Sequence, residues 1–180
     1  MEFKLDTVTE IFYLFSSLSW EWNRTFWNCV CTQKSFREIE RVSFQNEDIQ
    51  GGRITYIIED LLSEVSVYFS DPSLKSITWI SVLLNYFEGT DELSEDEYDC
   101  KINEFQKMFQ DVVNIAIFCL NHPRLLKEIG DDDFPEDYDA LRIAIWEIEN
   151  AQMIVKLEHQ DMEVPIILDL VIEPLHLSLS

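Results

Sequence analysis

Two clusters of carboxylates are the groups of this chain most able to support a chemical function. One spans residues 88–99 and the other spans residues 131–139. Clustered carboxylates bind hard divalent cations, stabilise the positive end of a helix dipole, or pair with the arginines and lysines of another protein. Neither cluster has the alternating acids and central glycine of an EF-hand loop, and helix capping with solvation is the alternative to partner binding. The carboxylates predicted to contact a partner are Glu92, Glu95, Asp96, Glu97, Asp99, Asp131, Asp132, Asp133, Glu136 and Asp137.

The net charge indicates what kind of partner this is. Thirteen Lys and Arg face thirty-five Asp and Glu, for a formal net charge of -22. Nucleic acids are bound mainly through neutralisation of their phosphates by basic side chains, and an anionic membrane surface attracts the same residues. We therefore predict neither nucleic acid nor membrane as a partner, but a basic protein that the field of the chain attracts and steers. The alternative is that the charge serves solubility alone.

Residues for enzymatic chemistry do not assemble along the sequence. The chain has no Gly-rich phosphate-binding loop, and none of its three histidines has a nucleophile beside it. Cys119 and His122 share a face of a predicted helix, but two ligands do not make a metal site. The sequence therefore predicts no cofactor, no metal site and no enzymatic activity. A carboxylate enzyme that uses a divalent cation is the remaining alternative.

The N-terminus and the cysteines indicate the compartment. The chain does not open with a basic segment followed by an apolar stretch, and no apolar run reaches the ~18 residues of a membrane span. In a chain with this much apolar material, the four cysteines are expected to be reduced. We therefore predict a cytoplasmic protein without membrane attachment.

The spacing of apolar residues predicts a mainly helical body over about residues 6–130. Four long helices and one short one are expected over residues 7–29, 54–69, 74–87, 94–119 and 124–129. The first helix is expected to continue toward Val42, and residues 45–52 are expected to form a loop.

Local signals add detail to two of these helices. Thr7 with Glu10, and Ser94 with Glu97, match the capping box that opens a helix. The first helix also carries three tryptophans, Trp20, Trp22 and Trp27. Because all three cannot face the core from one helix, one of them is expected at the surface as an interface anchor.

The last third of the chain is predicted to form a small antiparallel sheet over about residues 140–173. Residues 141–158 are rich in β-branched side chains, and residues 164–172 form a second apolar run across a polar turn at residues 159–163. A helix over residues 138–158 is the alternative, since apolar residues also recur there three and four apart. The predicted fold class is therefore α+β, with an all-helical bundle as the alternative. The length and the absence of repeats predict a single domain over the whole chain.

In general character the chain resembles bacterial immunity proteins. The resemblance rests on the acidic clusters Glu88–Asp99 and Asp131–Asp139, on a compact body without a catalytic motif. These small cytosolic proteins neutralise toxin domains delivered by neighbouring cells. The resemblance implies tight binding to a cognate toxin, often a basic nuclease, at its active site or a nearby surface. No family motif is matched, so no site residues carry over.

Taken together, these features predict an acidic binding protein that neutralises a basic partner, as an immunity or antitoxin-type inhibitor does. A non-catalytic adaptor or scaffold subunit, which would use an exposed apolar patch, is the alternative. For the inhibitor, charge reversal in Glu95–Asp99 or Asp131–Asp133 is expected to weaken partner binding and to leave thermal stability nearly unchanged.

Overall fold

The structure, a computed structural model, describes residues 3–45, 50–135, 138–160 and 163–175. Its helices are α1 (Leu5–Ser16), α2 (Arg24–Gln33) and α3 (Glu95–Leu120), with a short 3-10 helix η1 (Thr90–Glu92). Its strands are β1 (Phe36–Gln45), β2 (Gln50–Ile58), β3 (Ser63–Phe69), β4 (Ile77–Phe87), β5 (Leu125–Glu128), β6 (Arg142–Ile148), β7 (Ala151–Glu158) and β8 (Ile166–Pro174). None of the helices in these ranges is long and apolar enough to cross a membrane.

The strands form one sheet in the order β1-β2-β3-β4-β8-β7-β6-β5. The chain groups into two compact units. Unit 1 comprises Met1–Leu18, Leu83–Glu147 and Met153–Leu170, and unit 2 comprises Ser19–Val82, Ile148–Gln152 and Val171–Ser180. The prediction of a single domain stays a prediction.

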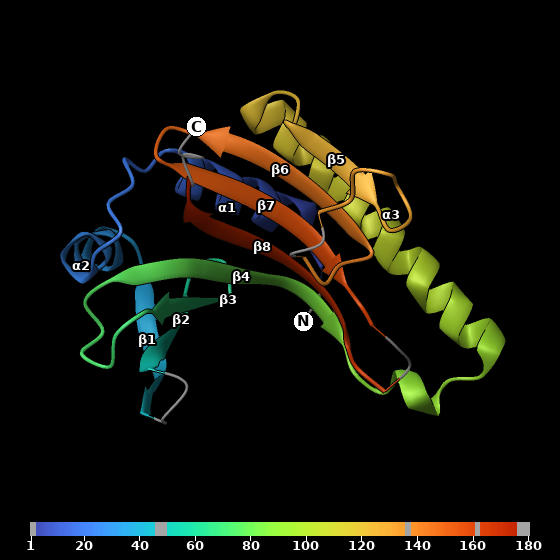
Figure 1. Cartoon of the computed structure of the whole chain (residues 1–180), viewed down its shortest axis with the longest axis horizontal. Coiled ribbons are helices and arrows are strands. Elements are labelled where there is room, and N and C mark those ends of the chain that lie inside the picture. Colours follow the sequence, from blue (N-terminus) through green and yellow to red (C-terminus); the bar gives the residue numbers. More distant parts are fainter. Residues whose placement is uncertain (1–2, 46–49, 136–137, 161–162, 176–180) are drawn as a thin grey trace. The chain divides into compact units, whose positions relative to one another are not determined.

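Unit 1 is built from α1, α3 and the strands near them (Figure 1). Helix α1 buries the apolar stripe that its sequence predicts, which is Val8, Ile11, Phe12 and Phe15. The Phe12 ring meets Trp146 of β6 edge-on at 6.5 Å. From α3, the Phe109 ring lies under the guanidinium group of Arg142, also on β6. Both helices therefore bury aromatic side chains against the same strand.

Unit 2 is built around an aromatic cluster between α2 and the first two strands. Asn23 caps α2 by accepting a hydrogen bond from the Phe26 amide at 2.9 Å. Trp27, which is fully buried, then packs edge-on against Phe36 of β1 and Tyr56 of β2. Since aromatic rings bury large areas and prefer such edge contacts, this cluster attaches α2 to the sheet.

The prediction of a mainly helical fold, and its all-helical alternative, are wrong. Residues 54–69 lie in β2, a turn and β3, and residues 77–87 form β4. Strand β3 pairs antiparallel with both β2 and β4. In β3 the buried residues alternate along the strand, as Val65, Val67 and Phe69 do. The helical spacing of residues 54–69 arises from two strands joined by a turn. This turn contains Leu61 and Leu62, and because turns are usually polar, the sequence does not indicate it.

The single helix predicted over residues 7–29 is also wrong, because α1 ends at Ser16 and α2 starts at Arg24. Thr7 and Glu10 do not form a capping box, since α1 already begins at Leu5. The expected continuation toward Val42 is strand β1. In the predicted loop over residues 45–52, the described residues at both ends belong to strands β1 and β2, and the rest lies outside the described residues.

Other elements agree with the sequence. The helix expected from Ser94 is α3, and its capping box is present. Residues 142–148 and 151–158 are strands β6 and β7, joined by a turn at Glu149 and Asn150, and not a helix.

Two further predictions for this part of the chain are wrong. The sheet is neither small nor confined to the C-terminal third, because its first four strands precede α3. The short helix expected over residues 124–129 is strand β5, paired with β6. All four cysteines are free.

We expect Asn121, which follows α3, to store backbone strain. Its φ of 71° and ψ of -163° favour glycine. Its carbonyl accepts the indole N–H of Trp146 at 2.9 Å, a contact that any residue at this position can make. The substitution Asn121→Gly should raise the free energy of unfolding by about 1 kcal/mol in urea denaturation, and Asn121→Val should lower it. Equal stability of the Gly and Asn chains would contradict the strain.

We expect Asp71, in the turn between β3 and β4, to make the stability of unit 2 sensitive to acid. A hydrogen bond from the Ser73 hydroxyl, then those from the Ser76 and Lys75 amides at 2.9 and 3.0 Å, lowers the pKa of Asp71 to about 2. Because this pKa lies below the unfolded value of about 3.9, the carboxylate stabilises the fold above about pH 4 and loses that effect as the pH falls through about 2.

The variant Asp71→Asn isolates this contribution. Its deficit in the free energy of unfolding relative to the wild type should be largest near neutral pH and should shrink between about pH 4 and about pH 2. Urea denaturation of both chains at each pH gives the difference directly. A deficit that stays constant over this range would show that the ionised carboxylate contributes nothing.

Candidate functional site

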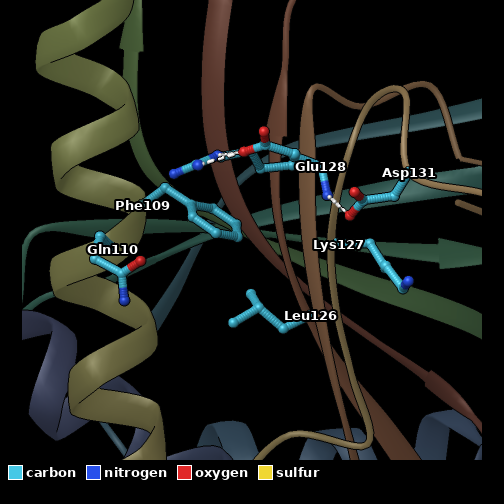
Figure 2. A pocket seen from close by; sticks show the side chains of 7 residues that line it. Phe109, Gln110, Leu126, Lys127, Glu128 and Asp131 are labelled. Carbon is cyan, nitrogen blue, oxygen red and sulfur yellow. Dashed lines mark hydrogen bonds and ion pairs between the residues drawn. The ribbon is translucent and has the colours of Figure 1, made fainter.

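A surface cavity of about 200 Å³ lies between α3 and the edge strand β5 in unit 1. Figure 2 shows Phe109 and Gln110 of α3 on one side and Leu126, Lys127 and Glu128 on the other. Strand β5 ends the sheet on this side, so its outer edge has no strand to pair with among the described residues. Edge strands present backbone N–H and C=O groups on which another chain can dock.

Charged side chains fix the shape of this cavity. Arg142 of β6 reaches across to Glu128, with its Nε at 3.1 Å from the Glu128 Oε2, and its Nη2 forms an ion pair with the same carboxylate. The Asp131 carboxylate accepts a hydrogen bond from the Glu128 amide at 3.0 Å, drawn as a dashed line in Figure 2. Asp133 lies 3.9 Å from the Lys127 ammonium group. The start of the second acidic cluster is therefore attached to β5.

The predicted partner-binding residues of this second cluster are only partly described. Asp131, Asp132 and Asp133 are exposed in the loop after β5. Glu136 and Asp137 lie outside the described residues. Of the three exposed acids, Asp131 has a structural role in the turn.

The first cluster surrounds the N-terminus of α3. Glu92 lies in η1, and Glu95, Asp96, Glu97 and Asp99 lie in the first turns of α3, all exposed. Glu97 closes the capping box, since its carboxylate accepts the Ser94 amide at 3.0 Å and the Ser94 hydroxyl at 2.6 Å. The hydrogen bond from the Ser94 hydroxyl has the larger effect and that from the Ser94 amide the smaller, and both lower the pKa of Glu97. Charge reversal across Glu95–Asp99 would therefore weaken α3, contrary to the expectation of unchanged stability.

The first cluster and the start of the second cluster do not form one continuous site. Asp96 opens α3, whereas the cavity beside Asp131 is lined by Gln110 of the same helix. At 1.5 Å per residue these positions are roughly 20 Å apart along the helix. A partner that touches both the start of α3 and the acids beside β5 must therefore span a face of ordinary interface size.

Apolar side chains accompany the acids near β5. Leu126 is 47% exposed, Ile129 just after the strand is 65% exposed, and Phe118 near the end of α3 is 79% exposed. Exposed large apolar residues close to charges are typical of protein interfaces, where they supply affinity and the charges supply orientation. The sequence does not predict that Phe118 and Leu126 are exposed, because both lie in segments whose apolar spacing predicts helices.

The expected tryptophan anchor is not one of the three proposed. Trp20 and Trp27 are buried, and Trp22 is half-buried with its indole N–H donated to the Asn150 carbonyl at 3.2 Å. The exposed tryptophan is Trp79 of β4, which is 40% exposed and stacks on Tyr68 of β3 at 4.3 Å. The pair lies on cross-strand neighbours.

No cation site emerges from the part of the chain that the structure describes. There, no group of three or more His, Cys, Asp and Glu side chains is arranged to hold a metal ion. Comparison with known protein families, with curated proteins and with solved structures finds no match to this chain. The candidate site therefore rests on its own geometry.

We expect Asp131 to act on the turn through its acceptor oxygen more than through its charge. Asp131→Asn keeps an oxygen for the Glu128 amide, whereas Asp131→Ala removes it. Hydrogen–deuterium exchange of the Glu128 amide should therefore accelerate in the Ala chain and change little in the Asn chain, with a loss of about 1 kcal/mol in local protection. Similar exchange in all three chains would exclude this bond.

Proposed function

We propose that this chain is an acidic binding protein that neutralises a basic partner, in the manner of an immunity or antitoxin-type inhibitor of a toxin such as a nuclease. The observation that carries the proposal is the surface around β5. There the outer edge of β5, which pairs with no strand of the described ranges, and the exposed Leu126 and Ile129 adjoin the exposed carboxylates of Asp131, Asp132 and Asp133.

Charge supports a basic partner for this surface. With a net charge of -22, the chain attracts cationic proteins over a distance of about one Debye length, which is about 8 Å at physiological salt. Exposed carboxylates then pair with the arginines and lysines that a nuclease uses to bind phosphates. Such pairs set the rate of association and the orientation of the partner.

Apolar contacts would supply the affinity that exposed charges do not. Exposed ion pairs contribute about 0–1 kcal/mol each, whereas apolar anchors buried at the centre of an interface can contribute 2 kcal/mol or more. Ile129 and Leu126, beside the acids, are suited to this role. Inhibition would follow if the partner docks with its phosphate-binding groups over the acidic loop.

A non-catalytic adaptor or scaffold subunit is the second candidate. Two features favour it: Phe118, which is the most exposed large apolar side chain among the described residues, and the stacked pair of Tyr68 and Trp79. An adaptor of this kind would associate mainly through apolar area. Its complexes would resist salt, which screens charge but not apolar contacts.

The experiment that tests the proposal is partner capture from the native lysate, followed by kinetics and activity assays with the purified partner. We expect a basic protein whose activity is lost in the complex. Its association rate constant should fall at least about tenfold between about 50 and about 500 mM NaCl. The double substitution Asp132→Lys with Asp133→Lys should lower the association rate constant below that of the wild-type chain at the same salt concentration. The substitution Ile129→Ser should increase the dissociation rate constant.

The matched control is Asp60→Lys with Glu64→Lys, two exposed acids of unit 2. It changes the net charge of the chain by the same amount but leaves the surface around β5 intact. A larger effect of the Asp132 and Asp133 variant than of this control would locate the contact. Equal effects would exclude this surface, and a salt-resistant complex with a partner that keeps its activity would favour the adaptor.

A further inference from the structure

The two outermost strands of the sheet differ in how their edges are protected. Strand β1 carries a β-bulge between Glu38 and Glu40, among charged side chains, and both features keep other strands from adding to an edge. Strand β5 instead pairs with β6 in regular register and begins with Leu125 and Leu126. A regular edge of this kind can pair with a strand of another chain. We therefore looked for the groups that cover it.

One hydrogen bond shows which backbone groups of β5 face away from β6. The Ile129 amide, just after β5, donates to the carbonyl of Leu141, just before β6, at 2.8 Å. Successive residues of an antiparallel strand point their N–H and C=O groups in alternate directions, so those of Glu128 and Leu126 point outward. Strand β5 ends the described sheet on this side. Its outer edge therefore offers the backbone groups of two residues.

Asp131 bonds to both outward groups of Glu128. Its carboxylate accepts the Glu128 N–H at 3.0 Å (Figure 2), and its own N–H donates to the Glu128 C=O at 3.1 Å. Gly130, with a φ of 97°, allows the tight turn that brings Asp131 back to the strand. A strand that adds to β5 must displace these bonds. Only Leu126 then remains, and a ladder of one residue is too short to hold a second strand.

We propose that Asp131 closes the edge of β5 against strand addition by a second copy of this chain. The inference does not depend on the proposed function. An edge closed in this way keeps the chain from pairing with itself and leaves the surface around β5 accessible to a partner.

The edge is complementary to itself once it is open. In an antiparallel pair with Leu126 opposite its own equivalent, Glu128 of each copy lies opposite Arg124 of the other. Opposite charges at such positions and contact between the two exposed leucines favour this two-fold arrangement. The net charge of -22 on each copy opposes it, since like charges repel. A second copy is therefore the occupant that the edge excludes, and salt favours its approach.

Sedimentation equilibrium of the full chain in about 500 mM NaCl, which screens the repulsion between copies, tests the proposal. The substitution Asp131→Ala removes the acceptor of the Glu128 amide. The loss of one such bond changes an equilibrium about fivefold, and both copies lose it, so the dimer dissociation constant should fall about 25-fold relative to the wild type. A variant as monomeric as the wild type would overturn the proposal.

Two matched variants separate the hydrogen bond from the charge. Asp131→Asn loses the same charge but keeps an oxygen for the Glu128 amide, and Asp132→Ala loses the same charge at the next exposed position. Both should keep the wild-type dissociation constant. An equal fall in these two variants and in Asp131→Ala would overturn the proposal, because lower repulsion alone would then explain it.

The substitution Gly130→Val opens the edge by a second route. A Cβ at this position meets no described atom within 4 Å, so the substitution acts through the unfavourable φ of the turn alone. It should lower the dimer dissociation constant in the same direction as Asp131→Ala. An unchanged constant in a folded Gly130→Val chain would contradict a role of this turn.

Hydrogen–deuterium exchange shows whether the dimer forms at β5. In the Asp131→Ala chain, the outward amide of Leu126 should exchange at least about tenfold more slowly above the dimer dissociation constant than below it. The amides of β1, at the other end of the sheet, should exchange equally at both concentrations. A dimer that protects β1, or that leaves the Leu126 amide unprotected, would overturn the proposal.

Discussion

The burial of β7 and β8 on both faces is the constraint on which the rest of the structure depends. In β7, Met153, Ile154 and Val155 follow one another and all are fully buried, although adjacent residues of a strand point to opposite faces. Strands buried in this way accept few charged side chains. The many carboxylates of the chain are therefore concentrated in turns, at the start of α3 and beside the edge strand.

The acidic residues in these places have two kinds of role. Glu97 closes the cap of α3, Asp131 holds the turn after β5, and Asp71 holds the turn before β4. In each case a carboxylate accepts backbone N–H groups that would otherwise lack a partner. Acids with such roles fix the loops, and neighbours such as Asp132 remain available for a partner. The two alternatives for the clusters, capping and docking, thus apply to different residues of the same segments.

The second acidic cluster lines a different cavity of unit 1 at each of its ends. At its start, Asp131 lines the cavity next to β5, and at its end, Asp139 lines a second cavity together with His159. Exposed charge near β5 suits the steering of a partner, since it acts at a distance and is weakened by salt.

The sequence by itself determined the features whose signals are local. The capping box of Ser94 and Glu97 and the apolar stripe that follows predicted α3, the β-branched run predicted strands over residues 141–158, and the acids of the described clusters are exposed. Only the tertiary structure decided the rest. Residues 54–69 have helical spacing, but pairing with neighbouring strands makes them β2 and β3, and β5 is a strand because it pairs with β6. The contact of Tyr98 with His159 joins residues 61 positions apart. The spacing of apolar residues depends only on the segment itself and can fit both a helix and a strand. Hydrogen bonding with strands that are distant in the sequence then decides which of the two forms.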